Sequence, residues 1–394
     1  MKLLLSAISA LAVAASAQAA DQVKLGIIFG FTGPIESLTP AMAAAAELAA
    51  REVSDSGMLL GGATVETVRG DSTCVDSAAA TSAAENLITV DNVNAIVGAD
   101  CSGVTGAILQ NVALPNGIVM ISPSATSPGL SSVEDNGLFF RTAPTDARQG
   151  QLMSEIVMER GFSSVALTYT NNDYGKGFAD SFESAFTAAG GTITASLAHD
   201  DDKGDYSAEI ASLDAAGGDA LVVVGYVDQG GQGIIRASLD SGSFDTFVLP
   251  DGMHGDSLTD AFGSNIDGSF GTLPGTDSLG ASMLGEIAEN AGIDGGSPFV
   301  SEAYDAAALL LLAMQAANSA ASADIKNEIM NVANAPGEQI FPGELAKGLE
   351  ILAAGGDVDY VGGSAVELIG PGESAGNYAI REIQNGEFVT VEYR

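Results

Sequence analysis

Short apolar runs alternate with longer stretches of helical periodicity along most of this chain. The runs have the length and composition of buried strands, and the stretches between them repeat apolar residues at helical spacing. The first series opens with a strand at residues 23–29 and a helix at 40–53, and the second opens with a helix at 146–160 and a strand at 164–169. Two such series predict an α/β protein with two doubly wound parallel sheets, one in each of two lobes.

The last third of the chain breaks this alternation. It is mainly helical from residue 279 to 353, Gly-rich from 355 to 376, and ends in two strands that Asn385–Gly386 joins as a hairpin. This order fits a chain that returns to the first lobe and then crosses again to the second. We therefore expect lobe 1 to hold residues 20–141 and about 272–376, and lobe 2 to hold residues 142–271 and about 377–394.

The N-terminus has the pattern of an export signal. Lys2 precedes an apolar run at residues 3–15, and Ala17–Gln18–Ala19 has the small-x-small form that a signal peptidase reads. We expect residues 1–19 to be a signal peptide that is cleaved near Ala19. No later stretch reaches the roughly 18 apolar residues that a membrane span needs, so we expect a periplasmic protein that does not insert into the membrane.

Charge and cysteine content narrow the possible partners. The chain has 14 Lys and Arg against 51 Asp and Glu, a formal net charge of −37, which disfavours nucleic acid and anionic membrane surfaces. Cys74 and Cys101 are the only cysteines, and in an exported chain such a pair favours a disulfide over two buried thiols. The only histidines, His199 and His254, lack metal-ligand spacing, so we expect no metal and no cofactor.

Two loops that follow predicted strands carry candidate binding groups. Ser102 follows the strand at residues 95–97 and opens a helix, so its hydroxyl lies beside the first free backbone N–H groups of that helix. The loop Ser122–Thr126 follows the strand at 118–121. Because parallel strands end at the same edge of a sheet, the two loops are expected to face each other and to form a site for a carboxylate.

Several sequence blocks in a fixed order carry a family resemblance. They are VKLGIIFGFTGP (23–34), the pair Cys74 and Cys101, CSGVTGA (101–107), ISPSATSPGL (121–130), FRTAP (140–144), NDYGKGF (172–178), VVVGYVDQGGQGIIRAS (222–238) and LPDG (249–252). Together they resemble the type I periplasmic solute-binding proteins of ABC transporters, in the leucine/isoleucine/valine-binding branch. The resemblance covers nearly the whole mature chain.

The resemblance implies a fold, a role and a set of ligand contacts. Two lobes would be joined by a hinge of three strand crossings that closes over an amino acid, branched-chain or related. Ser102 and Thr126 would hold its α-carboxylate. The implied contacts to its α-ammonium are Asp251, the carbonyl in the Ser124–Ala125 loop and the region of Tyr226, and Tyr174 would close over the ligand. A monomer would deliver the ligand to an inner-membrane ABC permease with its ATPases, without enzymatic chemistry.

Two departures from the family pattern bear on the ligand. Many relatives carry Glu where this chain has Asp251, and the loop that offers an aromatic ring in branched-chain binders here has Glu36, Ser37 and Leu38. Glu36 either meets a polar ligand side chain or, as we favour, is solvated. The two departures therefore favour an amino acid as the ligand more strongly than a branched-chain side chain. The alternatives are a non-amino-acid ligand, such as an aromatic acid, an amide or a urea, and a role as a periplasmic ligand sensor.

Simpler interpretations exist for most of these residues. Ser102 can be a helix cap, Thr126 and Asp251 can be turn residues, and Tyr174 and Tyr226 can pack within their own lobe. Residues 255–258 spell the GDSL motif of certain esterases. No His follows Ser257 to act as a base, so we do not expect hydrolase activity.

Overall fold

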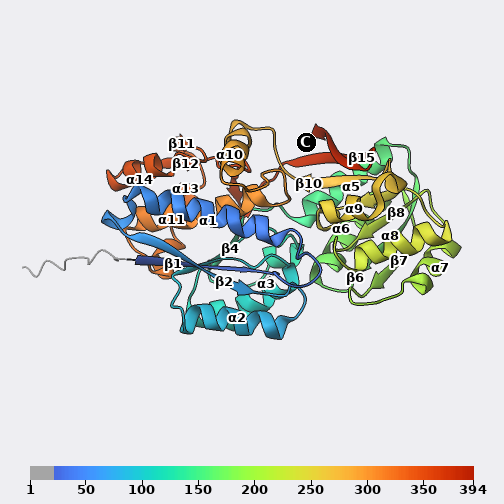
Figure 1. The fold of residues 1–394 in the computed structure, drawn as a ribbon, viewed down its shortest axis with the longest axis horizontal. Helices are drawn as coiled ribbons and strands as arrows, with labels where there is room; N and C mark the ends of the chain where they lie inside the picture. Colours follow the sequence, from blue (N-terminus) through green and yellow to red (C-terminus); the bar gives the residue numbers. More distant parts are fainter. Residues whose placement is uncertain (1–21) are drawn as a thin grey trace, which may run out of the picture.

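The computed structural model describes residues 22–394, and the expected signal peptide with its cleavage site near Ala19 lies outside them. Two α/β bodies lie side by side along the long axis of the molecule (Figure 1). Each is built on a seven-stranded sheet of mainly parallel strands covered by helices. The predicted fold class of two doubly wound lobes is confirmed.

The first lobe is built on the sheet with strand order β13-β14-β5-β4-β3-β1-β2. Its strands are β1 (Gln22–Phe29), β2 (Thr64–Asp71), β3 (Ala95–Gly98), β4 (Met120–Ser122), β5 (Phe139–Arg141), β13 (Leu368–Ile369) and β14 (Glu373–Ser374). Its early helices are α1 (Thr39–Ser56), α2 (Ser77–Thr89) and α3 (Ser102–Ile108), which continues as a helical segment to Asn116. Only β13 runs antiparallel to its neighbour in this sheet.

The second lobe is built on the sheet with strand order β16-β15-β10-β9-β8-β6-β7. Its strands are β6 (Ser164–Thr170), β7 (Thr192–His199), β8 (Ala220–Val224), β9 (Phe247–Leu249), β10 (Phe270–Pro274), β15 (Tyr378–Gln384) and β16 (Glu387–Tyr393). Its helices are α5 (Asp146–Glu159), α6 (Asp173–Ala188), α7 (Ser207–Ala216), α8 (Gly230–Ser241) and α9 (Asp256–Phe262). The terminal hairpin pairs antiparallel with β10.

The later helices return to the first lobe. They are α10 (Leu279–Asn290), α11 (Val300–Ala317), α12 (Ser322–Ile325), α13 (Ile329–Val332) and α14 (Leu345–Ala353), with a small parallel pair formed by β11 (Glu338–Ile340) and β12 (Val358–Tyr360). The chain passes between the two sheets after β5, after β10 and after β14. These are the three crossings of the expected hinge, and we place the lobe boundaries in them.

Helix α11 forms the centre of the first lobe. Its residues from Ala306 to Met314 are all fully buried, and it packs against the Ala-rich α1. Small alanine side chains on α1 allow the two helices to approach closely. The apolar stretch at 306–313 is thus a core helix, and no helix among residues 22–394 is long and apolar enough to cross a membrane.

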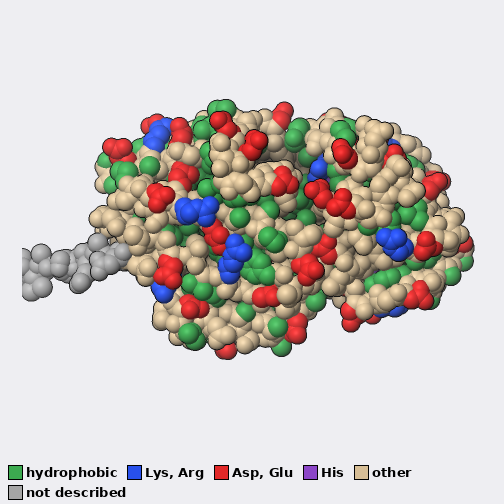
Figure 2. Space-filling model, in the orientation of Figure 1, with side chains coloured by type: hydrophobic (Ala, Val, Ile, Leu, Met, Phe, Trp, Pro, Cys, Tyr) green, Lys and Arg blue, Asp and Glu red, His purple; other side chains and the backbone are tan. Residues whose placement is uncertain are grey.

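Acidic side chains are spread over both lobes on the face that Figure 2 draws, with few basic side chains between them. This distribution fits a solvated acidic surface rather than one acidic binding face.

The two cysteines form the expected disulfide. The Cys74–Cys101 bond joins the loop after β2 to the residue before α3, across 27 residues of sequence. Both cysteines are buried, so the bond fixes the start of α3 against the neighbouring strand.

We predict that neither cysteine reacts with a thiol reagent in the unreduced native protein. Replacing both by serine should lower the free energy of unfolding by about 3–4 kcal/mol, since the bond closes a 27-residue separation. Mass spectrometry of the labelled protein, together with denaturant unfolding, measures both effects. Ready labelling without reductant would exclude the bond.

Candidate functional site

A cavity lies between the two lobes, with about 370 Å³ of space free of protein atoms, including its open mouth. One part of its wall is apolar and consists of Ile35, Leu38, Met42 and Phe299. The other part is polar or aromatic and consists of Asp100, Cys101, Ser102, Ser124, Tyr174, Tyr226, Asp251 and Gly252. A small cavity with an apolar side and a few polar groups suits one small organic molecule.

The two predicted loops of the first lobe face each other. Ser102 is the first residue of α3, and its hydroxyl accepts a hydrogen bond of 3.1 Å from the backbone N–H of Ser127. The hydroxyl of Ser124 donates to the backbone carbonyl of Asp100 at 3.1 Å. These two bonds tie the loop after β4 to the loop after β3, so both present polar atoms at the same edge of the sheet.

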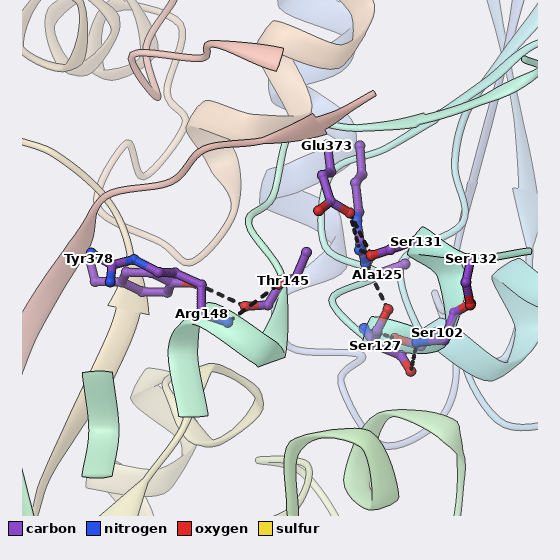
Figure 3. A network of polar contacts seen from close by, with 11 residues as sticks. Ser102, Ala125, Ser127, Ser131, Ser132, Thr145, Arg148, Glu373 and Tyr378 are labelled. Atoms are coloured by element: carbon purple, nitrogen blue, oxygen red, sulfur yellow. Dashed lines mark hydrogen bonds and ion pairs between the residues drawn. The ribbon is translucent and has the colours of Figure 1, made fainter. Parts of the chain in front are cut away.

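A buried guanidinium holds the second loop in shape. Arg141 ends β5 and is 1% exposed. It donates to the carbonyl oxygens of Ala125 and Ser127, each at 2.9 Å, to the Ser131 hydroxyl at 2.6 Å and to the Glu373 carboxylate at 2.7 Å. Figure 3 shows Ser131 and Glu373 meeting beside the loop that carries Ala125 and Ser127. The guanidinium thus joins β5, the loop after β4 and β14.

Ala125 and Thr126 lie in this loop but do not form part of the cavity wall. Both are fully buried. The Thr126 hydroxyl lies beside the Asp146 carboxyl and opposes the rise in the pKa of that group, but its geometry falls short of a full hydrogen bond. The backbone carbonyl of Thr126 accepts from the N–H of Asp146 at 2.9 Å. A carbonyl oxygen has two lone pairs, so the Ala125 carbonyl keeps one beyond the bond from Arg141. Of the seven predicted contact residues, the structure brings five to the wall: Ser102, Ser124, Tyr174, Tyr226 and Asp251.

The second lobe contributes an aromatic pair and a carboxylate. Tyr174 lies in the first turn of α6, and its ring stacks on that of Tyr226 with 5.3 Å between centroids. The Tyr174 hydroxyl donates to the Asp251 carboxylate at 3.0 Å and accepts from the N–H of Gly252 at 3.2 Å. A Cβ atom on Gly252 would lie 2.6 Å from the carbonyl oxygen of Gly225, so this close approach requires glycine.

Buried acids dominate the electrostatics of the site. Burial raises the pKa of Asp251 to about 6, although hydrogen bonds from Tyr174 and Gly252 oppose the shift. Asp146 is fully buried, and neither of its carboxylate oxygens has a hydrogen-bond partner. Burial, followed by the charge of Asp251, raises the pKa of Asp146 well above its usual range. A cation in the cavity would stabilise the ionised form of these acids.

Asp100 is a third buried acid at the cavity, but its carboxylate accepts several hydrogen bonds. Its carboxylate accepts from the N–H of Gly30 at 2.6 Å and from the Ser72 hydroxyl at 2.9 Å. Burial still raises its pKa. These bonds join the ends of β1, β2 and β3, so Asp100 shapes the edge of the first sheet from which Ser102 projects.

The sequence reasoning missed several residues of this region. Arg141 and Asp146 lie at the two ends of the first crossing, which follows β5. Ser102 was found because binding residues often follow the carboxyl ends of parallel strands, and the same reasoning could have been applied to the end of β5. Phe299 lies just before α11 with a φ of 60°, and no local pattern marked it. Glu36 is exposed, whereas its neighbour Leu38 is buried at the cavity wall.

Comparison with known proteins identifies the family. A family model described as periplasmic binding protein matches residues 22–345. This chain belongs to the periplasmic binding proteins. The Leu/Ile/Val-binding protein homolog 1 of Brucella melitensis is 30% identical over 305 residues, which are 77% of this chain and 80% of that protein.

Solved structures share the fold of this periplasmic binding protein. The crystal structure of a leucine-binding protein from Thermotoga maritima has a TM-score of 0.80 at 22% identity and covers 94% of this chain and 98% of that one. A solute-binding protein of an ABC transporter from R. palustris, in complex with benzoate, has a TM-score of 0.74 at 18% identity, with coverages of 94% and 96%. Ligands as different as these are bound by one fold, so the ligand must be argued from the site.

We predict that Arg141→Met lowers the free energy of unfolding of this periplasmic binding protein by about 3 kcal/mol, because Glu373 and the carbonyl groups of the loop lose a buried cationic partner. Denaturant unfolding followed by circular dichroism measures the loss. Arg148→Met, at an exposed position in α5, is the matched control. Equal stability of the two variants would contradict a role for Arg141 in holding the loop.

Proposed function

We propose that this protein captures an amino acid in the cavity between its lobes and delivers it, as a periplasmic monomer, to an inner-membrane ABC permease. The observation that carries the proposal is the buried carboxylate of Asp251, which faces the same small cavity as the Ser102 and Ser124 loops. A carboxylate removed from water needs a cation or strong hydrogen-bond donors. An α-ammonium group supplies both, and the α-carboxylate of the same ligand suits the hydroxyls and N–H groups of the first lobe.

The orientation of the ligand follows from these groups. The α-carboxylate is proposed to contact Ser102 and, if the loop moves when the ligand binds, the hydroxyl of Thr126, which lies behind the cavity wall. The α-ammonium is proposed to contact Asp251, the free lone pair of the Ala125 carbonyl and the Tyr226 region. Tyr174 packs over the ligand from the second lobe, with its hydroxyl held by Gly252.

The apolar wall indicates the class of side chain. Ile35, Leu38, Met42 and Phe299 form one side of the cavity, and burial of aliphatic carbon against them is favourable by about 25 cal/mol per Å². An aliphatic amino acid, branched-chain or related, therefore fits best. An aromatic acid, an amide or a urea would leave the Asp251 carboxylate without a cationic partner in a closed cavity.

Contacts between the lobes close the cavity over its contents. The carboxylate of Asp228 in the second lobe accepts from the N–H of Ser37 in the first lobe at 2.8 Å, and the N–H of Asp228 donates to the carbonyl of Pro34 at 3.0 Å. The Ser257 hydroxyl donates to the other Asp228 oxygen at 2.6 Å and orients it. We call these contacts of Asp228 with Ser37 and Pro34 the latch, and we propose that they hold the lobes together once the hinge has closed.

We predict that Asp251→Asn weakens amino-acid binding by about 2–4 kcal/mol, because the ammonium loses its charged partner. Isothermal titration calorimetry of wild type and variant measures the difference. Asp256→Asn makes the same change at an exposed position five residues away and should leave the affinity unaltered. An unchanged dissociation constant for Asp251→Asn would contradict the proposed contact.

Amino-acid affinity should also depend on pH. Because the pKa of Asp251 is about 6 in the empty site, the carboxyl must lose a proton to bind an ammonium below that pH. The affinity should therefore be about tenfold weaker at pH 5 than at pH 7. The same titrations with Asp251→Asn should show a much smaller pH dependence, and equal dependence in both proteins would exclude Asp251 as its origin.

Loss of the latch should speed ligand release. Asp228→Ala removes the acceptor for Ser37, a hydrogen bond at an exposed rim, so we expect affinity to fall by about 1 kcal/mol, mainly through the dissociation rate. Stopped-flow fluorescence during ligand displacement measures that rate. Asp240→Ala, an exposed acid of the same lobe without a contact to the first lobe, serves as the control. Equal release rates in the two variants would exclude the latch.

A further inference from the structure

A second hollow lies beside the crossing between β10 and α10. It has about 1130 Å³ of space free of protein atoms including its open mouth, and residues of both lobes line it. From the first lobe come Phe299, Glu302 and the turn at Gly363–Ser364, and from the second come Arg381 and Tyr393. Its position on the hinge means that its walls move relative to each other whenever the lobes reorient.

Glu302 is an unpaired buried acid in the wall of this hollow. It lies in the first turn of α11, is 3% exposed, and among residues 22–394 its carboxylate has no hydrogen bond or ion pair with another side chain. Burial raises the pKa of Glu302 to about 8. Asp305, one turn further along α11, differs because its carboxylate accepts hydrogen bonds from Tyr360 and from the Gly363–Ser364 turn. The carboxylate of Glu302 is thus compensated only by a hydrogen bond from its own backbone N–H, and it has no partner of opposite charge.

Arg381 is an unpaired cation in the same wall. It lies on β15, its guanidinium stacks on the Phe388 ring at 4.9 Å, and its Nε is buried without an acceptor. Among the described residues Arg381 makes no salt bridge, with Glu302 or with any other acid, and the charges of Asp256 and Asp294 act on it only from beyond ion-pairing distance. One face of the hollow thus offers a carboxylate and another a guanidinium, and the space between them is open.

Phe299 separates the hollow from the ligand cavity, because it lines both. Its carbonyl accepts from the N–H of Ala303, so the backbone of Phe299 is fixed to the start of α11, three residues before Glu302. A molecule in the hollow would therefore share a wall with the ligand in the cavity.

We propose that the hinge hollow binds a second small zwitterion, an amino acid, with its ammonium group at Glu302 and its carboxylate at Arg381. Such a ligand neutralises both unpaired groups at once. Because Glu302 belongs to the first lobe and Arg381 to the second, the bound molecule bridges the hinge. Its binding free energy is then coupled to the orientation of the lobes, and so to the affinity of the main cavity. This site does not depend on the identity of the ligand in the main cavity.

The test is the number of ligands bound per chain at saturation. Equilibrium dialysis against radiolabelled glycine, L-alanine and L-leucine at millimolar concentration should give two bound molecules per chain for at least one of them. Glu302→Gln and Arg381→Gln should each reduce that number to one, and in Asp251→Asn one of the two molecules should bind about 30- to 1000-fold more weakly than in the wild type. Glu286→Gln, at an exposed position on α10, should still bind two.

The outcomes separate this proposal from the proposed function. One molecule per chain that is lost in Asp251→Asn and kept in Glu302→Gln would overturn the hinge site and support the cavity. One molecule that is lost in Glu302→Gln and Arg381→Gln but kept in Asp251→Asn would support the hinge site and contradict the cavity assignment. Absence of amino-acid binding in the wild type would overturn the hinge site. Thermal melting of each variant verifies folding, and either of the two substitutions in the hollow suffices for the test.

Discussion

The central constraint in this molecule is the burial of the Asp251 carboxyl in the wall of a small cavity between the lobes. Tyr174 and Gly252 supply hydrogen bonds, yet burial still raises the pKa of the Asp251 carboxyl, and Asp146 nearby is a second buried acid whose pKa is raised well above its usual range. A site of this kind is incomplete until a cation enters it. That is the property expected of a binding protein, because the ligand then stabilises the closed arrangement of both lobes.

The residues of the site lie at the ends of neighbouring strands. In the first sheet, β3, β4 and β5 end side by side, and they are followed by Ser102, by the Ser124 loop and by the crossing that begins after Arg141. Arg141 holds the loop after β4, and the Asp100 carboxylate holds the backbone after β1, through buried hydrogen bonds. The polar atoms of this sheet edge are therefore in position before a ligand binds. Preorganisation of this kind reduces the entropy lost on binding. The second lobe then needs to bring only Tyr174, Tyr226 and Asp251 across the hinge.

Much of this was accessible from sequence. The strand and helix alternation predicts both sheets because periodicity is local, and the cysteine pair follows from count and compartment. The helical region at residues 279–353 was predicted less completely, because it also contains the strand β11, and α12 and α13 are separated by a turn that keeps Ile325 and Ile329 in the core. Arg141, Asp146 and Phe299 were missed because their roles depend on partners distant in sequence, such as Glu373 and Asp251. The hollow at the hinge likewise exists only once both lobes are assembled.

The most direct test of the account is a thermal-shift screen of the mature protein, refolded from denaturant to remove any ligand carried through purification. A ligand that binds only the native state raises the melting temperature with its concentration. The screen compares α-amino acids with aromatic acids, amides and ureas. We predict concentration-dependent stabilisation by aliphatic α-amino acids, and Asp251→Asn should reduce the shift in melting temperature at each ligand concentration. Stabilisation by aromatic acids, amides or ureas alone would contradict the amino-acid site.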